Sequence, residues 1–309
     1  MPDRAPDISV VVTTFNGERF LREQLDSILA QTLPPREIVV VDDGSVDGTM
    51  AILESYAAAD PRFRIFRNEE NLGYVRNFEK GMQLATGALV ALSDQDDVWL
   101  PHKLAVLRDR LGDGLIVYSD SELVDEEGRR LGRRMSDVMI QIGYDNCLMY
   151  AVGAWAPGHA MLFRRELVEL CLPFPTLVTH DFWLGFTATC HGAIRYVDEP
   201  LVLYRQHRGN AIGAGTRARK AGRPRPTRAE KLARIRARMR LLYERCPAGN
   251  RQGKEVFRVI HESYRNFSPR NDWIRMVIFL RYRHLILAYK KKSAPMKLLF
   301  CLKMFFAID

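Results

Sequence analysis

The sequence predicts an α/β fold, in which a Rossmann-like sheet is flanked by helices, followed by a helical C-terminal extension. Two observations carry this prediction. Short apolar runs of strand length alternate with stretches of helical periodicity from Ile8 to about Tyr204, a pattern typical of βαβ units whose sheet is covered on both faces. Beyond Arg205 the character changes, and the sequence becomes basic with helical periodicity.

The individual elements follow in order along the chain. Strands are predicted for five apolar runs, at residues 8–12, 37–41, 63–66, 88–92 and 115–119. One helical face is predicted from Leu21, Leu25, Ile28 and Leu29, and another from Val75, Phe78, Met82 and Ala85. Glycines stand at the junctions, where tight strand-to-helix turns favour a residue without Cβ: Gly44, Gly48, Gly73 and Gly87. We interpret all of these as core and turn positions.

Three regions are expected. They are an α/β domain over residues 1–206, a flexible basic loop over residues 207–228 and a basic amphipathic helical region over residues 229–309. Within the third region, helical patterns cover residues 227–246, 272–289 and 293–308. No pattern there supplies an unbroken apolar run of about 20 residues, so no membrane span is expected.

Charge divides the chain in the same place. The net charge of the whole chain is +9. Residues 1–200 hold 19 basic and 31 acidic side chains, a net charge of −12. Residues 201–309 hold 27 basic and 6 acidic side chains, a net charge of +21. The acidic part can gather carboxylates for a cation. The basic part needs an anionic surface, either nucleic acid or the inner leaflet of a membrane.

The five cysteines are scattered without a CxxC pair, so neither a disulfide framework nor a zinc cluster is predicted. This cysteine usage favours a reducing compartment. The first residues contain only a short apolar run, less than a signal-peptide core requires, and we therefore expect a cytoplasmic protein.

The first candidate site is VVVDDGSVDGT at residues 39–49, where a buried strand ends in two carboxylates and a glycine turn. Ligands of open α/β sheets bind outside the carboxyl ends of the strands, so Asp42 and Asp43 are placed to touch one. A carboxylate can accept the imide N–H of a pyrimidine base, the role we assign to Asp43. The alternative is that both aspartates only cap the turn.

The second candidate site is ALVALSDQDDVWLP at residues 88–101, in which an apolar strand delivers Asp94, Asp96 and Asp97 at its carboxyl end. Three negative charges so close repel one another unless a cation is present. Oxygen ligands suit Mg²⁺ or Mn²⁺, and such an ion makes a diphosphate a better leaving group. The alternative is a solvated acidic loop.

Two further segments carry polar groups. In THDFWLGFTA, at residues 179–188, Asp181 is either a helix N-cap or a catalytic base. In LVLYRQHRGN, at residues 201–210, the last predicted strand ends in Arg205, His207 and Arg208. This basic cluster either holds a phosphate or forms an ordinary surface loop.

Four segments, in this order, resemble family 2 glycosyltransferases with the GT-A fold, a nucleotide-diphospho-sugar transferase fold built on a Rossmann-like mixed sheet. They are ISVVVTTFNGERFLREQLDSILAQTL (8–33), EIVVVDDGSVDGT (37–49), NLGYVRNFEKGMQLATGALVALSDQDDVW (71–99) and HDFW (180–183). The variant with SDQDDVW, HD followed by aromatics, and YRQH is most similar to bacterial rhamnosyltransferases of polysaccharide assembly. The resemblance covers roughly the first 210 residues.

The resemblance implies a role for several residues. Thr13 and Asp43 would line the nucleoside pocket, with Arg76 near the base or the phosphate. Asp94 and Asp96 would form the DxD motif, with Asp96 the direct ligand of Mg²⁺ or Mn²⁺ and Asp94 closer to the ribose. Asp181 would be the catalytic base.

His180 departs from the family pattern, because it stands where the family commonly has glutamate. The base is therefore assigned through Asp181 alone. The QxxRW motif of processive synthases is absent, which argues against a polymerase.

The implied reaction is an inverting transfer of one sugar from a nucleoside-diphosphate donor to a hydroxyl of a glycan or polyprenyl-linked acceptor in cell-surface polysaccharide synthesis. The donor would be dTDP-rhamnose or a UDP-sugar. Asp181 would take the proton of the acceptor hydroxyl as its oxygen attacks the anomeric carbon.

Two other classes of protein compete with this interpretation. One is a nucleic-acid-binding protein that acts through its basic C-terminal region, but we find no recognisable nucleic-acid-binding module and expect no nucleic acid partner. The other is a catalytically inactive sugar-nucleotide binding module, against which the retained aspartates argue.

The end of the chain favours a membrane. KKK at residues 290–292 precedes LLFCLKMFF at residues 298–306, and a lysine cluster beside an apolar helix can bind an anionic leaflet. We expect a peripheral protein on the inner face of the membrane. The alternative is that these apolar residues pack back onto the α/β domain.

Overall fold

The computed structural model describes residues 7–207, 227–266 and 268–306. Nine strands form one sheet: β1 (Ile8–Thr14), β2 (Glu37–Asp42), β3 (Phe63–Arg67), β4 (Leu89–Ser93), β5 (Val98–Trp99), β6 (Ile116–Val124), β7 (Arg130–Arg134), β8 (Met161–Arg164) and β9 (Ile194–Arg205). Helices α1 to α7 belong to the same part of the chain: α1 (Leu21–Leu29), α2 (Thr49–Ala59), α3 (Tyr74–Leu84), α4 (Lys103–Leu111), α5 (Met135–Val138), α6 (Glu166–Cys171) and α7 (His180–His191).

The sheet is mixed, and its strand order is β3-β2-β1-β4-β8-β6-β9-β5, with β7 paired to β6. Strands β3, β2, β1 and β4 are parallel. Strand β8 runs antiparallel to both β4 and β6, and β6 and β9 are parallel. The predicted GT-A mixed sheet is therefore confirmed. Its parallel half brings the carboxyl ends of β1, β2 and β4 to the same edge.

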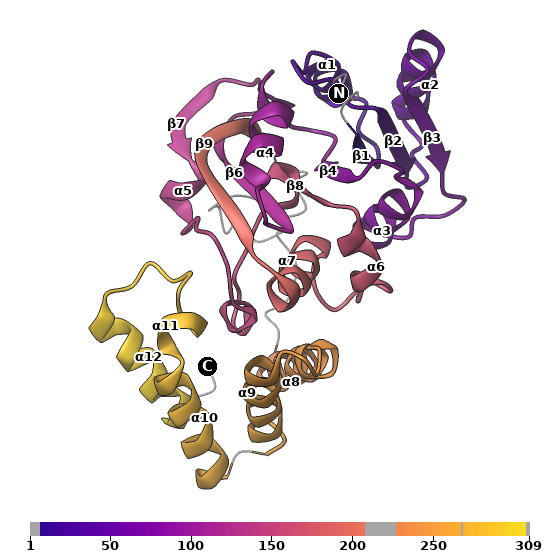
Figure 1. Ribbon diagram of the computed structural model, residues 1–309. Coiled ribbons are helices and arrows are strands. Elements are labelled where there is room, and N and C mark those ends of the chain that lie inside the picture. Colours follow the sequence, from indigo (N-terminus) through magenta and orange to yellow (C-terminus); the bar gives the residue numbers. More distant parts are fainter. Residues whose placement is uncertain (1–6, 208–226, 267, 307–309) are drawn as a thin grey trace.

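Helices cover both faces of the sheet, as the sequence predicts (Figure 1). One buried cluster joins Val11 and Val41 to α3, α6 and α7, and a second joins Val10 and Val40 to α1, α2 and α4. Alternate residues of β1 and β2 therefore serve opposite cores. Helix α3 lies so close to the sheet that a Cβ on Gly81 would stand 2.4 Å from a methyl carbon of Val11.

The five predicted strands are confirmed as β1, β2, β3, β4 and β6, each within a few residues of its expected bounds. Strand β8, the short strands β5 and β7 and the 3-10 helices η1 (Cys147–Tyr150) and η2 (Gly158–Ala160) were not predicted. Most of the predicted loop at 207–228 lies outside the described residues, since the structure describes nothing between 207 and 227.

Between residues 227 and 306, the described part of the C-terminal region contains five helices: α8 (Arg228–Arg245), α9 (Arg251–Ser263), α10 (Pro269–Arg281), α11 (Arg283–Ile286) and α12 (Ala294–Phe306). The helix expected over 227–246 is α8, whereas the stretch expected over 272–289 is divided between α10 and α11, and α9 was not predicted. No helix in the described ranges is long and apolar enough to cross a membrane.

The C-terminal helices lie next to α7 (Figure 1) and share its hydrophobic core. Phe257 of α9 meets Phe186 of α7 with ring centroids 5.7 Å apart, and Leu242, Ile260 and Cys301 are fully buried in the same cluster. Part of the apolar surface of this region thus packs onto the α/β domain. The apolar residues of α12 pack on α10, where the rings of Phe279 and Phe300 have centroids 6.4 Å apart.

Candidate active site

Polar side chains from three segments lie close together at the carboxyl edge of the parallel strands. The His207 imidazole, after β9, lies 2.6 Å from Asp96, after β4. At the start of α7, Asp181 lies close enough to Asp94 for its negative charge to raise the pKa of Asp94. Three separate segments of the sequence thus bring Asp94, Asp96, Asp181 and His207 close together.

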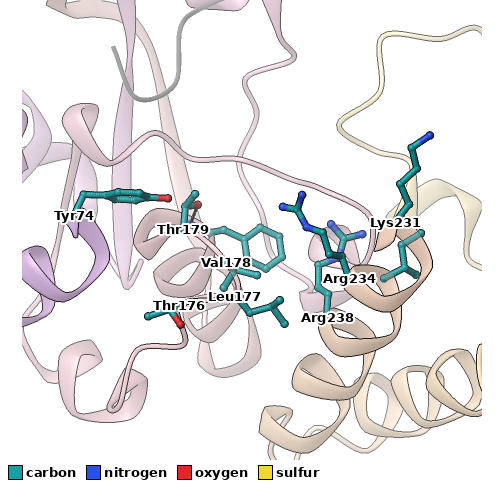
Figure 2. Close-up of a pocket in the computed structure, with 10 residues that line it drawn as sticks. Tyr74, Thr176, Leu177, Val178, Thr179, Lys231, Arg234 and Arg238 are labelled. Atoms are coloured by element: carbon teal, nitrogen blue, oxygen red, sulfur yellow. Dashed lines mark hydrogen bonds between the residues drawn. The ribbon is translucent and has the colours of Figure 1, made fainter. Parts of the chain in front are cut away.

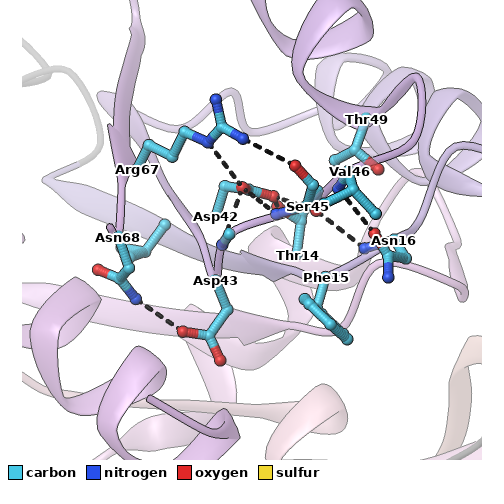
Figure 3. A network of polar contacts seen from close by, with 12 residues as sticks. Thr14, Phe15, Asn16, Asp42, Asp43, Ser45, Val46, Thr49, Arg67 and Asn68 are labelled. Carbon is cyan, nitrogen blue, oxygen red and sulfur yellow. Dashed lines mark hydrogen bonds and ion pairs between the residues drawn. The ribbon is translucent and has the colours of Figure 1, made fainter. Parts of the chain in front are cut away.

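Asp42 organises the turn after β2 (Figure 3). Its buried carboxylate accepts hydrogen bonds from the Thr14 hydroxyl at 2.8 Å and from the backbone N–H of Ser45 at 2.9 Å, and the Nε of Arg67 lies 3.8 Å away. All of these contacts hold the ends of β1 and β2 together. Asp42 is therefore a structural residue of the turn, as one of the two sequence interpretations held.

Asp43 points to the other side of the turn, toward the loop that leads into α3 (Figure 3). Its carboxylate accepts hydrogen bonds from the Asn68 side chain at 2.8 Å and from the backbone N–H groups of Leu72 and Gly73, both at 2.9 Å. Two carboxylate oxygens offer about four lone-pair sites, so about one site remains for a ligand. The role of Asp43 as acceptor for a base stays a prediction. The predicted contact of Thr13, near the end of β1, with the nucleoside also stays a prediction.

The three carboxylates after β4 have different environments. Asp94 and Asp96 are partly exposed, whereas Asp97 is fully buried and accepts a hydrogen bond from the backbone N–H of Arg205 at 3.1 Å. Loss of water contact, together with the charges of Asp96 and Asp181, raises the pKa of Asp94 to about 7. Burial also raises the pKa of Asp97. A cation at Asp94 and Asp96 would relieve this repulsion, while Asp97 supports the strand ends.

A buried lysine and histidine lie beneath the carboxylates. The Lys103 ammonium donates a hydrogen bond to the backbone oxygen of His159 at 2.6 Å and lies 3.3 Å from the centroid of the Trp99 ring. Burial and the Lys103 charge lower the pKa of His159 to about 3, so the imidazole is neutral. Ligand atoms of Asp94, Asp97 and His159 lie within 4.8 Å of one another, and these residues form a second possible metal set.

We favour Asp94 and Asp96, with His207, over this second set for a divalent ion. The choice depends on access, because Asp97 and His159 are buried and a diphosphate could not reach an ion between them. The buried Lys103 charge acts on both Asp97 and Asp94 and already offsets part of their negative charge.

Arg205 lies within the protein rather than at its surface. Its side chain is 2% exposed, and its guanidinium donates hydrogen bonds to Glu23 and to the backbone oxygens of Asp96 at 2.9 Å and Glu126 at 2.7 Å. These contacts hold the segment that carries Asp96. In this arrangement Arg205 positions the acidic residues. Its predicted direct contact with a donor phosphate stays a prediction, and the surroundings of the Arg205 side chain do not support it.

Asp181 lies in the first turn of α7, and the N-cap of that helix is Thr179. The Asp181 carboxylate accepts hydrogen bonds from the Thr179 hydroxyl, from the backbone N–H of Phe182 at 2.7 Å and from the indole N–H of Trp155. Three of about four lone-pair sites are used, so the carboxylate is oriented and can still take a proton. Trp155, in the loop after η1, was missed by sequence reasoning because nothing in its local pattern marks it.

His180 is buried beside Asp181. Its ring stacks on Phe78 with centroids 4.0 Å apart, and neither ring nitrogen has a hydrogen-bond partner within the described part of the chain. Burial lowers its pKa, so the imidazole is neutral.

Arg76, in the first turn of α3, forms an ion pair with Glu79 at 2.5 Å. Its side chain is 42% exposed, so a ligand can reach it from solvent.

A cavity of about 590 Å³ (Figure 2) is lined in part by Thr179 and Phe182, which both donate hydrogen bonds to Asp181. One wall is the segment 176–179 with Tyr74, and the other is α8, which contributes Lys231, Arg234 and Arg238. Burial lowers the pKa of Arg238, and its Nε has no hydrogen-bond partner among the residues that the structure describes. The cavity is thus basic on its α8 side and ends at Thr179, which bonds to Asp181.

Comparison with known proteins shows the family of the chain. Residues 9–171 match the profile described as glycosyl transferase family 2. The chain is 30% identical over 220 residues to an uncharacterized glycosyltransferase of Nostoc sp., and the match covers 66% of this chain and 66% of that protein. It is 36% identical over 104 residues to a putative teichuronic acid biosynthesis glycosyltransferase, TuaG, of Bacillus subtilis, and this match covers 34% of this chain and 41% of that protein. The match thus spans just under two thirds of the Nostoc protein's own length.

Solved structures support the fold. The crystal structure of S. aureus TarS residues 1–349 in complex with UDP-GlcNAc is similar with a TM-score of 0.59 and 17% identity, covering 97% of this chain and 90% of that one. The mannosyltransferase PcManGT of Pyrobaculum calidifontis, in complex with GDP-Man and Mn²⁺, gives a TM-score of 0.50 and 20% identity over 97% and 79%. At these identities the likeness shows the fold, while the profile match covers more than half of the sequence. The chain therefore belongs to glycosyl transferase family 2.

Proposed function

We propose that the protein transfers one sugar from a nucleoside-diphosphate donor to a hydroxyl group of an anionic glycan or polyprenyl-linked acceptor, with inversion at the anomeric carbon. The observation that carries this proposal is the convergence of Asp94 and Asp96 with Asp181. One carboxylate, Asp181, is oriented as a base, while the other two, after β4, are suited to a cation. This division of roles fits a single displacement with one base.

Asp96, Asp94 and His207 would hold Mg²⁺ or Mn²⁺. Carboxylate oxygens with an imidazole form a hard donor set suited to either ion, and the partial exposure of the two aspartates leaves room for a diphosphate. When bound, the ion would neutralise the charge that develops on the departing diphosphate. PcManGT, a structural neighbour, binds Mn²⁺, which supports a divalent ion here as well.

Asp181 acts on the acceptor. Its free lone pair would take the hydroxyl proton while the acceptor oxygen forms a bond to the anomeric carbon and the bond from that carbon to the diphosphate oxygen breaks. Thr179, Phe182 and Trp155 orient the carboxylate by hydrogen bonds. A base held in one orientation reduces the entropy cost of reaching the transition state.

The nucleoside would lie between the ends of β1 and β2, against Thr13 and Asp43, with Arg76 near the base or phosphate. The last lone-pair site of Asp43 suits the imide N–H of uracil or thymine, which favours a UDP-sugar or dTDP-rhamnose. TarS, whose fold is similar, was solved with UDP-GlcNAc.

The cavity beside α8 would bind the acceptor. Lys231, Arg234 and Arg238 give this wall three positive charges. The Nε of Arg238, which has no partner in the described part of the chain, suits a phosphate or carboxylate oxygen. An acceptor with a lipid-linked phosphate or a uronic acid has such a group. A relative named for teichuronic acid biosynthesis supports a role in polysaccharide synthesis.

A substitution on α8 tests the acceptor assignment. Arg234→Ala with Arg238→Ala should raise the acceptor KM at least tenfold, since a charge-assisted hydrogen bond contributes about 1.5 to 3 kcal/mol. Donor hydrolysis should be unchanged. Arg240→Ala is the matched control, because Arg240 lies on the same helix, is exposed and pairs with Glu244 at 2.7 Å. An unchanged acceptor KM in the double variant would exclude the cavity as the acceptor site.

We further propose that the protein acts in the cytoplasm as a peripheral protein on the inner face of the membrane. Although Phe300 and Cys301 of α12 pack inward, large apolar side chains of α10 and α12 remain exposed, among them Trp273 at 57% and Leu299 at 53%. Trp273 precedes the lysines at 290–292 in the chain, and Leu299 follows them. Exposed apolar side chains near a basic cluster support binding to an anionic leaflet.

Vesicle sedimentation tests the membrane proposal. Replacing Leu298, Leu299 and Leu302 by glutamine should reduce sedimentation with vesicles that contain anionic lipid, and high salt should reduce it for the unaltered protein. These substitutions avoid the buried Cys301, which a deletion of the tail would remove. Leu131→Gln, at an exposed leucine of β7, is the control. Equal sedimentation of the triple variant and the control would exclude α12 as the membrane contact.

A further inference from the structure

Three cysteines that are far apart in the sequence meet at the junction between the α/β domain and the C-terminal helices. Cys147 belongs to η1, Cys190 to the last turn of α7, and Cys246 is the C-cap of α8. Their sulfur atoms all lie within 4.8 Å of one another. The sequence predicted no metal cluster of cysteines because no short CxxC spacing is present, and it is the packing of η1, α7 and α8 that creates the group.

We propose that Cys147, Cys190 and Cys246 form a thiolate site for a single soft or borderline divalent ion, with Zn²⁺ as the expected occupant. Three sulfurs bound to one zinc at about 2.3 Å in tetrahedral geometry lie about 3.8 Å apart, so small side-chain adjustments would complete the site. A fourth position would be left for water or for His191, the residue after Cys190.

A polar side chain and the start of a helix lie against one of the sulfurs. The Asn250 side chain donates a hydrogen bond to the Cys147 sulfur at 3.5 Å and caps the N-terminus of α9 through the backbone N–H of Gly253. A Cβ at Gly253 would stand 2.6 Å from the same sulfur, so the start of α9 lies directly against Cys147. The positive end of a helix stabilises a nearby anion.

A second positive group lies on the opposite side. The Lys254 ammonium donates hydrogen bonds to the backbone oxygens of Cys246 at 3.0 Å and Tyr243 at 2.7 Å. Binding of Zn²⁺ by the three thiolates would release the thiol protons to solvent.

The site would join two parts of the fold. Cys147 and Cys190 belong to the α/β domain, whereas Cys246 ends the helix whose Arg234 and Arg238 line the cavity. An ion bound by all three would fix α8 against α7. This role is independent of the proposed reaction, because the thiolate ion lies apart from the carboxylates after β4.

Metal analysis and cobalt spectroscopy on the full chain test the proposal. Protein purified in reducing buffer without chelator should hold about one zinc per chain at this site, and Co²⁺ added after zinc removal should give the strong near-ultraviolet absorption of thiolate-to-cobalt charge transfer. Cys246→Ser and Cys147→Ser should each reduce zinc affinity at least tenfold. Cys301→Ser is the matched control, since Cys301 is equally buried and its thiol donates to the backbone oxygen of Phe279 at 3.4 Å.

Two further measurements separate the outcomes. Asp96→Ala should keep the cobalt–thiolate absorption, which distinguishes this site from the carboxylate site. If the unaltered protein shows no such absorption and all five cysteines react as free thiols, the three sulfurs only pack as buried side chains and the proposal is wrong. A mass two units lower under non-reducing conditions, removed by reductant, would reveal a disulfide and would also overturn it.

Discussion

Replacing Asp181 by asparagine separates the role of a base from that of a structural residue. The substitution keeps the volume of the side chain and the oxygen that accepts hydrogen bonds from Phe182 and Thr179. It places an NH₂ group where the carboxylate oxygen accepts from the Trp155 indole, so two donors face each other. Leaving a buried donor without its acceptor costs about 1 to 3 kcal/mol, and we expect a lower Tm by a few degrees.

The expected loss of activity is larger than this structural cost. A positioned general base contributes about 10²- to 10⁴-fold in rate, or about 3 to 5 kcal/mol of barrier, and asparagine cannot take the proton. Donor affinity should be unchanged or tighter, because the Asp181 charge repels that of Asp94 and its removal favours the cation at Asp94 and Asp96. The signature is therefore a lower kcat with an equal or lower donor Kd.

Transfer assays with calorimetry of donor binding measure both quantities. Trp155→Phe is the control for the structural part, since it removes the indole donor and keeps the carboxylate. It should share the loss of Tm and retain most of the turnover. If Asp181→Asn has the turnover of the unaltered protein, or loses donor affinity in proportion to kcat, Asp181 is not the base and our assignment of α7 fails.

Three further substitutions test other parts of the structure. Asp96→Ala should abolish dependence of transfer on Mg²⁺ or Mn²⁺ along with most activity, whereas full activity of the unaltered protein in EDTA would exclude a metal. Burial of Glu37 alone would raise its pKa, but hydrogen bonds from Ser9, Thr86 and Arg64 outweigh this effect and lower the pKa from 4.5 to about 2. The Glu37 carboxylate therefore contributes about 3 kcal/mol of stability above pH 4.5, and this contribution is lost as the pH falls toward 2. Glu37→Gln should flatten this acid dependence of unfolding, and an unaltered profile would contradict the argument. Gly81→Ala should lower the free energy of unfolding by about 1 to 3 kcal/mol, because the new Cβ would overlap a side-chain methyl of β1. Denaturant titration measures this loss, and an unchanged free energy of unfolding would show that α3 can move away from the sheet.

The sequence predicts the parallel half of the sheet well because its strands are buried on both faces. Such strands are continuous apolar runs, and β1, β2 and β4 each contain one. Strand β7, in contrast, is fully exposed and rich in arginine, and β5 has only two residues, so neither has an apolar pattern to detect. Their pairing depends on the strands beside them.

Helix α9 could have been found from its sequence. Val256, Phe257 and Ile260 are buried and recur at helical spacing, and Asn250 precedes them as a cap. The basic residues around this stripe give the segment a low mean hydropathy, which conceals a helix whose narrow apolar face is buried against the rest of the protein.

The candidate site shows where reasoning from sequence ends. The motif order brings Asp43, the carboxylates after β4 and Asp181 together, because strand ends meet at one edge of a parallel sheet. The sequence does not distinguish the buried Asp97 from its partly exposed neighbours, since burial depends on β9 and Arg205 far along the chain. Contacts such as Trp155 with Asp181 join segments that share no local pattern, and only the folded structure reveals them.

The sequence predicts the C-terminal helices as an extension, and in the structure they share a hydrophobic core with the α/β domain. Phe257 packs on Phe186 of α7, the helix that carries Asp181, and α8 forms one wall of the cavity. A chain that ends at Gln206 would expose this shared core, and each large apolar side chain left in water costs about 1.5 to 3 kcal/mol. We expect such a chain to have a lower Tm, to bind the dye ANS and to lose transfer to the acceptor. A truncated chain with the Tm and acceptor KM of the full protein would show that residues 1–206 are an independent enzyme.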